Sequence, residues 1–239
     1  MDVFHGKLKK EHAGRILDVA SGIGNFMGFL IEGFRDFDEL VCMDSNIKAV
    51  QTGNKHAEEY ENIIFVQGEA ADMDFRDETF DTVSIANSLH HMGHLDKVLD
   101  EMKRVLKPGG FFLVMEMRCD KLDSAQMSHK KFHHLAAEID RINGKFHENT
   151  FTKDEIVDII TDIGLEDLDI FECIPKMEKS MNNTIIEGRI NALERALDKM
   201  KNSEHYPHLI NLATEVKNHM RKFGYASATE IVAIGKKGQ

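Results

Sequence analysis

The chain lacks the features of membrane-spanning, secreted and disulfide-rich proteins. No apolar run in its 239 residues approaches the roughly 20 that a bilayer-spanning helix needs. The first residues, MDVFHGKLKKEH, carry charge but no apolar segment of about 7–15 residues, which argues against a secretory signal. Cys42, Cys119 and Cys173 are too far apart for a CxxC motif or a zinc-ligand spacing. We therefore expect a cytoplasmic protein with reduced thiols and no membrane partner.

Positive charge is also scarce. The chain has 30 Lys and Arg against 41 Asp and Glu, for a formal net charge of −11. Because affinity for phosphate backbones comes mostly from cations, we expect no nucleic-acid partner. With 42% hydrophobic residues the chain can bury a sizeable core, as one domain with an insertion or as one large and one small lobe.

The first half of the chain alternates strand-like and helix-like segments. Short apolar runs lie at 15–20, 40–44, 63–67, 79–87 and 110–117, and two later ones at 165–174 and 229–237. Apolar strands with helices between them are typical of a parallel sheet covered on both faces. The pattern predicts an α/β fold with a Rossmann-like, doubly wound, mostly parallel seven-stranded sheet.

The second half is mostly helical. Residues 123–143 read as one helix, and Thr152 and Glu155 form a capping box for the next. Two apolar seams with steps of three and four residues then run along 186–200 and 209–223, with Pro207 opening the second helix and Gly224 ending it. We expect a core of 1–175 and 225–239, in which 118–150 is a lid region, and an antiparallel helical hairpin inserted at 176–224. The hairpin is interpreted as core packing, a lid over the active site or a homodimer surface.

The segment ILDVASGIGNF (16–26) is a strand followed by a glycine turn and a helix-compatible stretch. Glycine is needed where a turn is tight or where the backbone approaches a ligand closely. Asp44 follows Gly24 by twenty residues, at the end of the next strand, where a carboxylate can accept hydrogen bonds from both hydroxyls of a ribose. The pattern indicates a ligand of the adenosine type, and the glycines alone leave a dinucleotide site open.

Further segments distinguish between a dinucleotide site and another adenosine-type site. GRILDVASGIGNF, VCMDSN, VQGEAADMDFRDETFDTVSIANSLHHM and LDEMKRVLKPGGFFLVMEM resemble, in order and spacing, the core of class I S-adenosylmethionine-dependent methyltransferases. The similarity covers about residues 13–117 and is greatest to the small-molecule (type 11) group that includes ubiquinone/menaquinone-biosynthesis-like enzymes. It implies S-adenosyl-L-methionine as cofactor and a small organic methyl acceptor, with an N, O, S or C accepting atom.

The resemblance also implies where the cofactor binds. The loop beside the methionine moiety corresponds to Asp18 and the glycine turn, Asp44 is the ribose-binding acid, and the adenine edge meets an acid, here Glu69. The family usually has glycine where Ala20 stands. The implied cofactor-binding residues are Asp18, Ala20, Ser21, Gly22, Gly24, Asp44, Ser45, Glu69, Ala70 and Asn87.

Methyl transfer from a sulfonium needs the acceptor held in line and, for some acceptors, a base. His91 is our candidate, since it follows the fourth strand at the edge where ligands bind in open α/β sheets. A structural helix-start histidine is the alternative. His129 and His133 have a spacing that permits a metal pair, completed by His147, His94 or Glu148, but a Lys/His-rich exposed helix face explains them as well. We assign no metal site.

Two other functions fit parts of the sequence. A non-catalytic adenosylmethionine-binding module would recruit a partner through the hairpin, and a nicotinamide-dependent oxidoreductase would use the same glycine loop. Without a sizeable segment before the first strand, the acceptor would be covered by 118–150 and the hairpin, with an apolar lining drawn from Met127, Phe132, Phe146, Phe151 and Met177.

Overall fold

The structure is a computed structural model and describes residues 6–174, 181 and 183–239. It divides into two compact units, each made of separate stretches of chain. The sheet unit comprises Met1–Glu116, Ile156–Glu172 and Ile231–Gln239, and the helical unit comprises Met117–Glu155 and Cys173–Glu230. Met177, one of the predicted lining residues, and most of the start of the predicted insertion lie outside the described residues.

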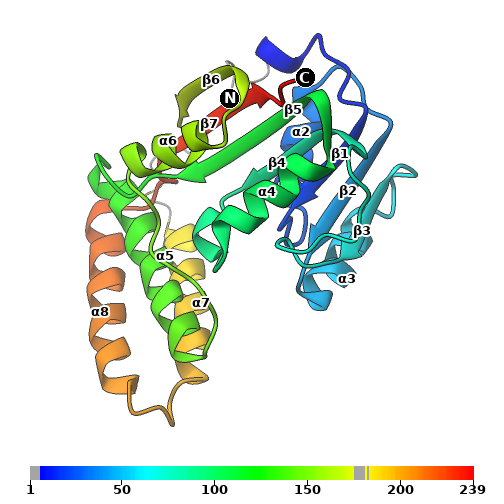
Figure 1. The fold of residues 1–239 in the computed structure, drawn as a ribbon. Coiled ribbons are helices and arrows are strands. Elements are labelled where there is room, and N and C mark those ends of the chain that lie inside the picture. Colours follow the sequence, from blue (N-terminus) through cyan, green and yellow to red (C-terminus); the bar gives the residue numbers. More distant parts are fainter. Residues whose placement is uncertain (1–5, 175–180, 182) are drawn as a thin grey trace. The chain divides into compact units, whose positions relative to one another are not determined.

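A seven-stranded sheet in the order β3-β2-β1-β4-β5-β7-β6 forms the framework of the sheet unit. The first four strands in this order are easily followed in Figure 1. The strands are β1 (Arg15–Val19), β2 (Glu39–Asp44), β3 (Ile63–Gln67), β4 (Phe80–Ala86), β5 (Leu106–Met117), β6 (Glu166–Cys173) and β7 (Glu230–Lys236). The pairs β1–β2, β1–β4, β2–β3 and β4–β5 are parallel. The predicted fold class is confirmed.

The topology brings particular loops together. After β3 the chain returns to pair β4 with β1, on the side opposite β2. Strand order therefore reverses at β1, and ligands of open α/β sheets bind at such a reversal, beyond the carboxyl ends of the strands. The residues after β1, β2 and β4 meet at this edge.

Helices follow most strands of the sheet unit. They are α2 (Met27–Gly33), α3 (Ile47–His56), the 3₁₀ turn η1 (Leu89–His91), α4 (Leu95–Val105) and most of α6 (Lys153–Asp162). The α3 helix begins where Asn46 caps the Lys48 amide, and α4 buries Val98, Met102 and Val105 on one face. These apolar faces cover the strands.

The β5 strand starts four residues earlier than the sequence pattern indicates. Phe80 pairs with Leu106 and Thr82 with Phe111, so Lys107–Gly110 form an irregularity opposite Asp81. A Cβ on Gly110 would lie 2.7 Å from the Asp81 carbonyl oxygen, which explains the glycine there. The apolar run alone does not reveal this extension.

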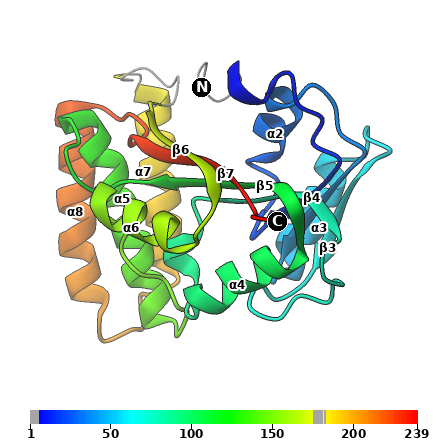
Figure 2. The same cartoon turned by 45° about the horizontal axis from the view of Figure 1, so that its top comes forward.

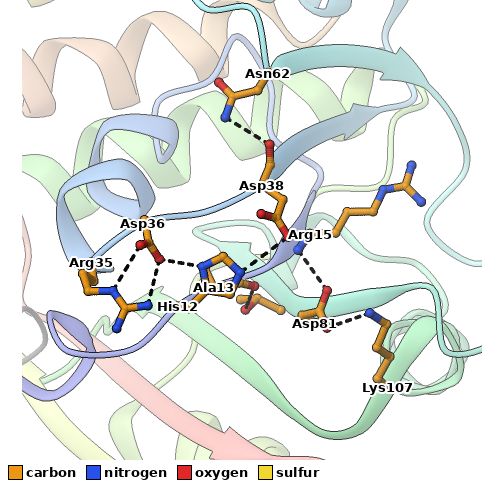
Figure 3. A network of polar contacts seen from close by, with 10 residues as sticks. His12, Ala13, Arg15, Arg35, Asp36, Asp38, Asn62, Asp81 and Lys107 are labelled. Atoms are coloured by element: carbon orange, nitrogen blue, oxygen red, sulfur yellow. Dashed lines mark hydrogen bonds and ion pairs between the residues drawn. The ribbon is translucent and has the colours of Figure 1, made fainter.

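Polar contacts tie together the amino ends of the strands, away from the carboxyl-end loops (Figure 3). The Asp81 carboxylate accepts hydrogen bonds from the Arg15 amide at 3.0 Å and from Lys107 Nζ at 2.7 Å. His12 pairs with Asp36, and Asn62 donates to the Asp38 carbonyl at 3.1 Å. These contacts fix the starts of β1, β4 and β5.

Three long helices, α5 (Ser124–Ile142), α7 (Asn183–Asp198) and α8 (Tyr206–Phe223), lie side by side in the helical unit (Figures 1 and 2). Asp123 and Gln126 form a capping box at the start of α5, and Pro207 lies in the first turn of α8. The two apolar seams pack on Leu135 and Ile139 of α5. Their buried members are Ile186, Ile190, Leu193, Leu197, Met200, Leu209, Ala213, Val216 and Met220.

The structure thus groups the predicted lid region with the predicted hairpin. Both seams are buried against α5, so they supply the core of this unit rather than an open apolar surface. Thr152 and Glu155 exchange the expected capping hydrogen bonds at the start of α6. No described helix is long and apolar enough to cross a membrane, and Cys42 and Cys119 form no disulfide.

Candidate functional site

The loop after β1 has an unusual backbone. Ala20 has φ 55°, Gly22 has φ 57° and Gly24 has φ 91°, all in the left-handed region that favours glycine. A Cβ on Gly22 would meet nothing within 4 Å, whereas one on Gly24 would lie 2.7 Å from Phe65 Cζ. The loop therefore needs glycine at position 24 because a side chain there would clash with Phe65. At Gly22 no protein atom lies near the missing side chain, so a ligand could approach the backbone.

The φ of 55° at Ala20 explains why the family usually has glycine at this position. Glycine at that position would adopt the left-handed conformation without cost, while alanine adopts it with strain. The Ser21 amide donates to the Met43 carbonyl at 3.0 Å and the Gly24 amide to the Ser21 carbonyl at 2.9 Å. These bonds hold the loop against the end of β2 and impose the strained conformation.

Asp44 ends β2 and faces the loop. Its Oδ2 accepts from the Gly22 amide at 2.8 Å and its Oδ1 from the Asn46 amide at 2.8 Å. A carboxylate has about four lone-pair sites, so each oxygen can still accept another hydrogen bond. The half-buried Asp44 is thus held rigidly and keeps acceptor capacity for a diol such as a ribose.

Asp18 lies beneath the loop with only 1% of its surface exposed. Its Oδ1 accepts from Ser84 Oγ at 2.7 Å, and its Oδ2 is buried with no hydrogen-bond partner among the described residues. Burial raises the pKa of Asp18 to about 7; the Ser84 hydrogen bond opposes this rise, and the Asp44 charge adds to it. A cationic group at Oδ2 would satisfy this oxygen and favour its ionised form.

The remaining predicted cofactor residues lie at the same edge of the sheet unit. The exposed Ser45 and Glu69 and the partly buried Ala70 follow β2 and β3. Ser45 accepts from Gln67 Nε2 through its carbonyl at 3.0 Å, and the Gly68 amide donates to the Asp44 carbonyl at 3.1 Å. Of the predicted cofactor residues up to Ala70, Asp18 lies within β1 and Asp44 ends β2, while the others lie in the loops after β1, β2 and β3.

Asn87 directly follows β4 with φ 49°, and its amide donates to the Met115 carbonyl at 2.7 Å. Ser88, the next residue, donates through Oγ to the Ala20 carbonyl at 3.3 Å and to the Ala86 carbonyl at 2.9 Å. This contact links the β4 loop to the glycine loop. The structure thus brings Asn87 to the edge where the sequence predicts it.

His91 lies in η1, directly after Asn87 and Ser88, and is partly exposed. Its ring centroid lies 4.4 Å from that of His90. His90 is fully buried, and its Nδ1 lies 2.9 Å from Glu116 Oε1. Glu116 Oε2 also accepts from the Leu89 amide at 2.9 Å, so one buried carboxylate holds this turn in place.

Two of these supporting residues escape the sequence analysis. Ser84 and Glu116 both lie inside apolar strand segments, FDTVSIA and FFLVMEM, and both are fully buried. A polar side chain that interrupts an apolar strand is costly to bury unless it is hydrogen-bonded. That interruption is the signal that could have identified them.

Of the histidines that the sequence offers as metal ligands, His129 and His133 do not pair in the structure. His129 is buried and its Nδ1 accepts from the Ala228 amide at 2.9 Å, and burial, followed by the charge of Arg189, lowers its pKa to about 4. Its ring centroid lies 6.4 Å from that of His133. His133 instead meets His147, with their Nε2 atoms 3.2 Å apart.

Known proteins support the interpretation of the sheet unit. Residues 17–114 match a family model described as a methyltransferase domain. The ubiquinone/menaquinone biosynthesis C-methyltransferase UbiE of Bartonella henselae is 35% identical over 117 residues, which cover 48% of this chain and 42% of that protein. The chain therefore spans less than half of the length of this curated relative.

Solved structures show the same fold over nearly the whole chain. A candidate methyltransferase from Bacillus halodurans is 19% identical with a TM-score of 0.63, covering 99% of this chain and 98% of that one. Phosphoethanolamine N-methyltransferase 2 of Haemonchus contortus, in complex with S-adenosyl-L-methionine, is 17% identical with a TM-score of 0.55, covering 100% of this chain and 51% of that one. Residues 17–114 are therefore similar to a methyltransferase domain, and the chain as a whole shares its fold with solved methyltransferase structures.

Proposed function

We propose that this protein transfers a methyl group from S-adenosyl-L-methionine to a small organic acceptor. The observation that carries the proposal is the buried Asp18 Oδ2, which has no hydrogen-bond partner among the described residues and lies beneath a glycine loop that Asp44 holds. S-adenosylmethionine has a cationic ammonium group and a ribose diol. These two groups match a buried carboxylate oxygen and a carboxylate with spare acceptor sites.

When bound, the cofactor supplies the reactive methyl group on its sulfonium. The chain's residues bind and orient it. Asp18 takes the ammonium group, the bare backbone at Gly22 allows close approach, and Asp44 and Ser45 hold the ribose side. Glu69 and Ala70 meet the adenine edge, and Asn87 lies at the end of β4 beside the reacting centre.

His91 is the proposed base for an acceptor that must lose a proton. It is more accessible than the buried His90, and the Glu116 contacts keep its turn in one conformation. His91→Asn should lower kcat by about 10²–10⁴-fold and leave cofactor affinity unchanged. A loss of cofactor binding in this variant would instead indicate a structural role.

Calorimetric titration tests the cofactor directly. The purified protein is titrated separately with S-adenosylmethionine, S-adenosylhomocysteine and NADH. Binding of the first two with no heat from NADH supports the proposal. Binding of NADH alone would favour the oxidoreductase alternative, and no binding by a folded protein would contradict the cofactor site.

Turnover separates an enzyme from a binding module. Release of S-adenosylhomocysteine is measured with a panel of small acceptors that starts from quinone-biosynthesis precursors and phosphoethanolamine, the chemistries named for the relatives above. The non-catalytic module would be favoured if the protein binds the cofactor, releases no S-adenosylhomocysteine with any acceptor, and captures a partner through its helical unit.

The roles of the other regions stay predictions. Coverage of the acceptor by 118–150 and 176–224, a homodimer through the hairpin and a cytoplasmic location belong to this proposal. Because both apolar seams are buried against α5, a dimer would have to use the outer, charged faces of α7 and α8, where Arg221 pairs with Glu187. Sedimentation of the wild type and an Arg221→Glu variant tests this interface.

A further inference from the structure

Two histidine side chains meet inside the helical unit. His133 lies on α5, and His147 lies in the segment that follows this helix. The two Nε2 atoms are 3.2 Å apart and the ring centroids 5.1 Å apart, with the rings at 70° to each other. His147 is 4% exposed, so one of the two nitrogens belongs to a buried ring.

The orientation of His147 is fixed by its neighbours. Its Nδ1 lies 2.9 Å from Asp140 Oδ2, and its carbonyl accepts a hydrogen bond from Arg141 Nη1 at 2.7 Å. Lys145 holds the other oxygen of Asp140 at 2.9 Å. A second contact joins α5 to this segment, since His134 Nε2 on α5 lies 2.9 Å from Thr150 Oγ1. The His147 ring is therefore held at Nδ1 by Asp140, and the His147 backbone is held at its carbonyl by Arg141.

These contacts set the protonation of the ring. A carboxylate only accepts hydrogen bonds, so His147 Nδ1 carries the proton that faces Asp140. A neutral His147 then presents a lone pair at Nε2, toward His133. Two imidazole nitrogens 3.2 Å apart either share an N–H···N hydrogen bond or direct both lone pairs at one metal ion.

The arrangement matches a histidine metal site in two respects. A carboxylate that holds the far nitrogen of a ligating imidazole is the usual outer partner of metal-bound histidine. Two imidazole nitrogens bound to one tetrahedral Zn²⁺ at about 2.0–2.1 Å lie roughly 3.3–3.4 Å apart, close to the observed separation.

We propose that His133 and His147 bind one divalent transition-metal ion of the zinc class, with Asp140 as the positioning residue of His147. Imidazole nitrogen suits Zn²⁺, Ni²⁺, Co²⁺ and Cu²⁺ rather than Mg²⁺ or Ca²⁺. Two protein nitrogens leave coordination positions for water or for a donor atom of a small molecule. The proposal revises the pairing considered from sequence, because His133 pairs with His147 and not with His129.

Zinc titration of the metal-free full-length protein tests the site without any cofactor or acceptor. We expect one Zn²⁺ per chain by calorimetry and by competition with a chromogenic chelator, and a higher Tm with zinc present. His133→Ala should weaken binding at least tenfold, and Asp140→Asn about 10–100-fold while sparing both ligands. Mg²⁺ should give no signal.

The controls separate this site from other histidines and from misfolding. His208→Ala, an exposed histidine on α8 of the same unit, should leave zinc binding unchanged. His147→Gln serves beside His147→Ala in case removal of the buried ring unfolds the unit, and circular dichroism reports the fold. No zinc binding by the folded wild type, or binding that the His133 and His147 variants do not weaken, would overturn the proposal and assign the 3.2 Å contact to an N–H···N hydrogen bond. Because no cofactor enters the assay, its outcome is independent of the methyltransferase proposal.

Discussion

The Gly22 amide donates a hydrogen bond to Asp44 Oδ2 at 2.8 Å, and this bond joins the loop after β1 to the end of β2. Asp44 therefore has two roles, since it holds the loop and keeps acceptor sites for a ligand. A charge-assisted hydrogen bond to a backbone amide fixes a carboxylate better than solvent does. The position of the carboxylate is thus set before any ligand binds.

Asp44→Ala should weaken S-adenosylmethionine binding at least 100-fold. It removes hydrogen bonds to a charged group, each worth roughly 1.5–3 kcal/mol, and frees the loop. Asp44→Asn keeps one acceptor oxygen, so its affinity for S-adenosylmethionine should lie between those of the wild type and Asp44→Ala. Calorimetry measures the affinities, with Asp96→Asn on the exposed face of α4 as a control; equal affinity in wild type and Asp44→Ala would exclude Asp44 from the site.

Ala20→Gly should stabilise the protein. Alanine at φ 55° carries a left-handed strain of about 1–2 kcal/mol, which glycine would remove. The greater conformational entropy of glycine in the unfolded chain offsets about 0.5–1 kcal/mol of this gain. The expected net gain is on the order of 1 kcal/mol, visible as a Tm increase of a few degrees. A lower Tm would show that the Ala20 methyl group makes contacts worth more than the strain.

Gly24→Ala should be more destabilising than Gly22→Ala. Both residues have positive φ, so both substitutions cost roughly 1–2 kcal/mol in the backbone. Only at Gly24 would the new Cβ lie 2.7 Å from Phe65 Cζ, and overpacking adds typically about 1–3 kcal/mol. Chemical denaturation compares the pair, and a Gly24→Ala, Phe65→Leu double variant should recover part of the loss.

Asp18 predicts a pH dependence of the apoprotein. Its folded pKa of about 7 lies above the ordinary value near 4, so the folded state binds the extra proton between these pH values. Stability should therefore fall as pH rises from about 4 to 7, by a few kcal/mol at most, and stay level above. Asp18→Asn should flatten this part of the profile.

The same variant separates stability from binding. Asp18→Asn should be at least as stable as wild type at pH 8, because it buries no charge, yet bind S-adenosylmethionine at least tenfold more weakly, because the ammonium loses its counter-charge. Denaturation curves from pH 4 to 8 and calorimetry at pH 8 provide the two measurements. Unchanged affinity would place the ammonium group elsewhere.

Leu193→Ala should destabilise the helical unit by about 2–5 kcal/mol, the usual cost of a buried Leu-to-Ala cavity. Leu193 is 3% exposed in the core shared by α5, α7 and α8. Ile185→Ala on the same helix, where the side chain is 38% exposed, should cost little. Cofactor affinity should change less than twofold in both, because the glycine loop and Asp44 lie in the sheet unit.

Much of the fold follows from local patterns. The apolar runs predict all seven strands to within a few residues, apart from the start of β5, and the three-four steps predict α7 and α8. Both patterns reflect which side of an element faces the core, which each segment carries in itself. The start of β5 depends instead on how Lys107–Gly110 pass Asp81, a contact between distant segments.

The sequence by itself determined the parallel sheet, the glycine loop and the acid at Asp44, because each is encoded within a few neighbouring residues. Only the tertiary structure decided that Ser84 hydrogen-bonds Asp18, that Glu116 holds His90, that His133 meets His147 and that α5 covers the hairpin seams. These contacts join side chains that are 14 or more residues apart along the chain. Residue types and spacing do not specify such contacts, because the packing of whole elements sets the distance between them.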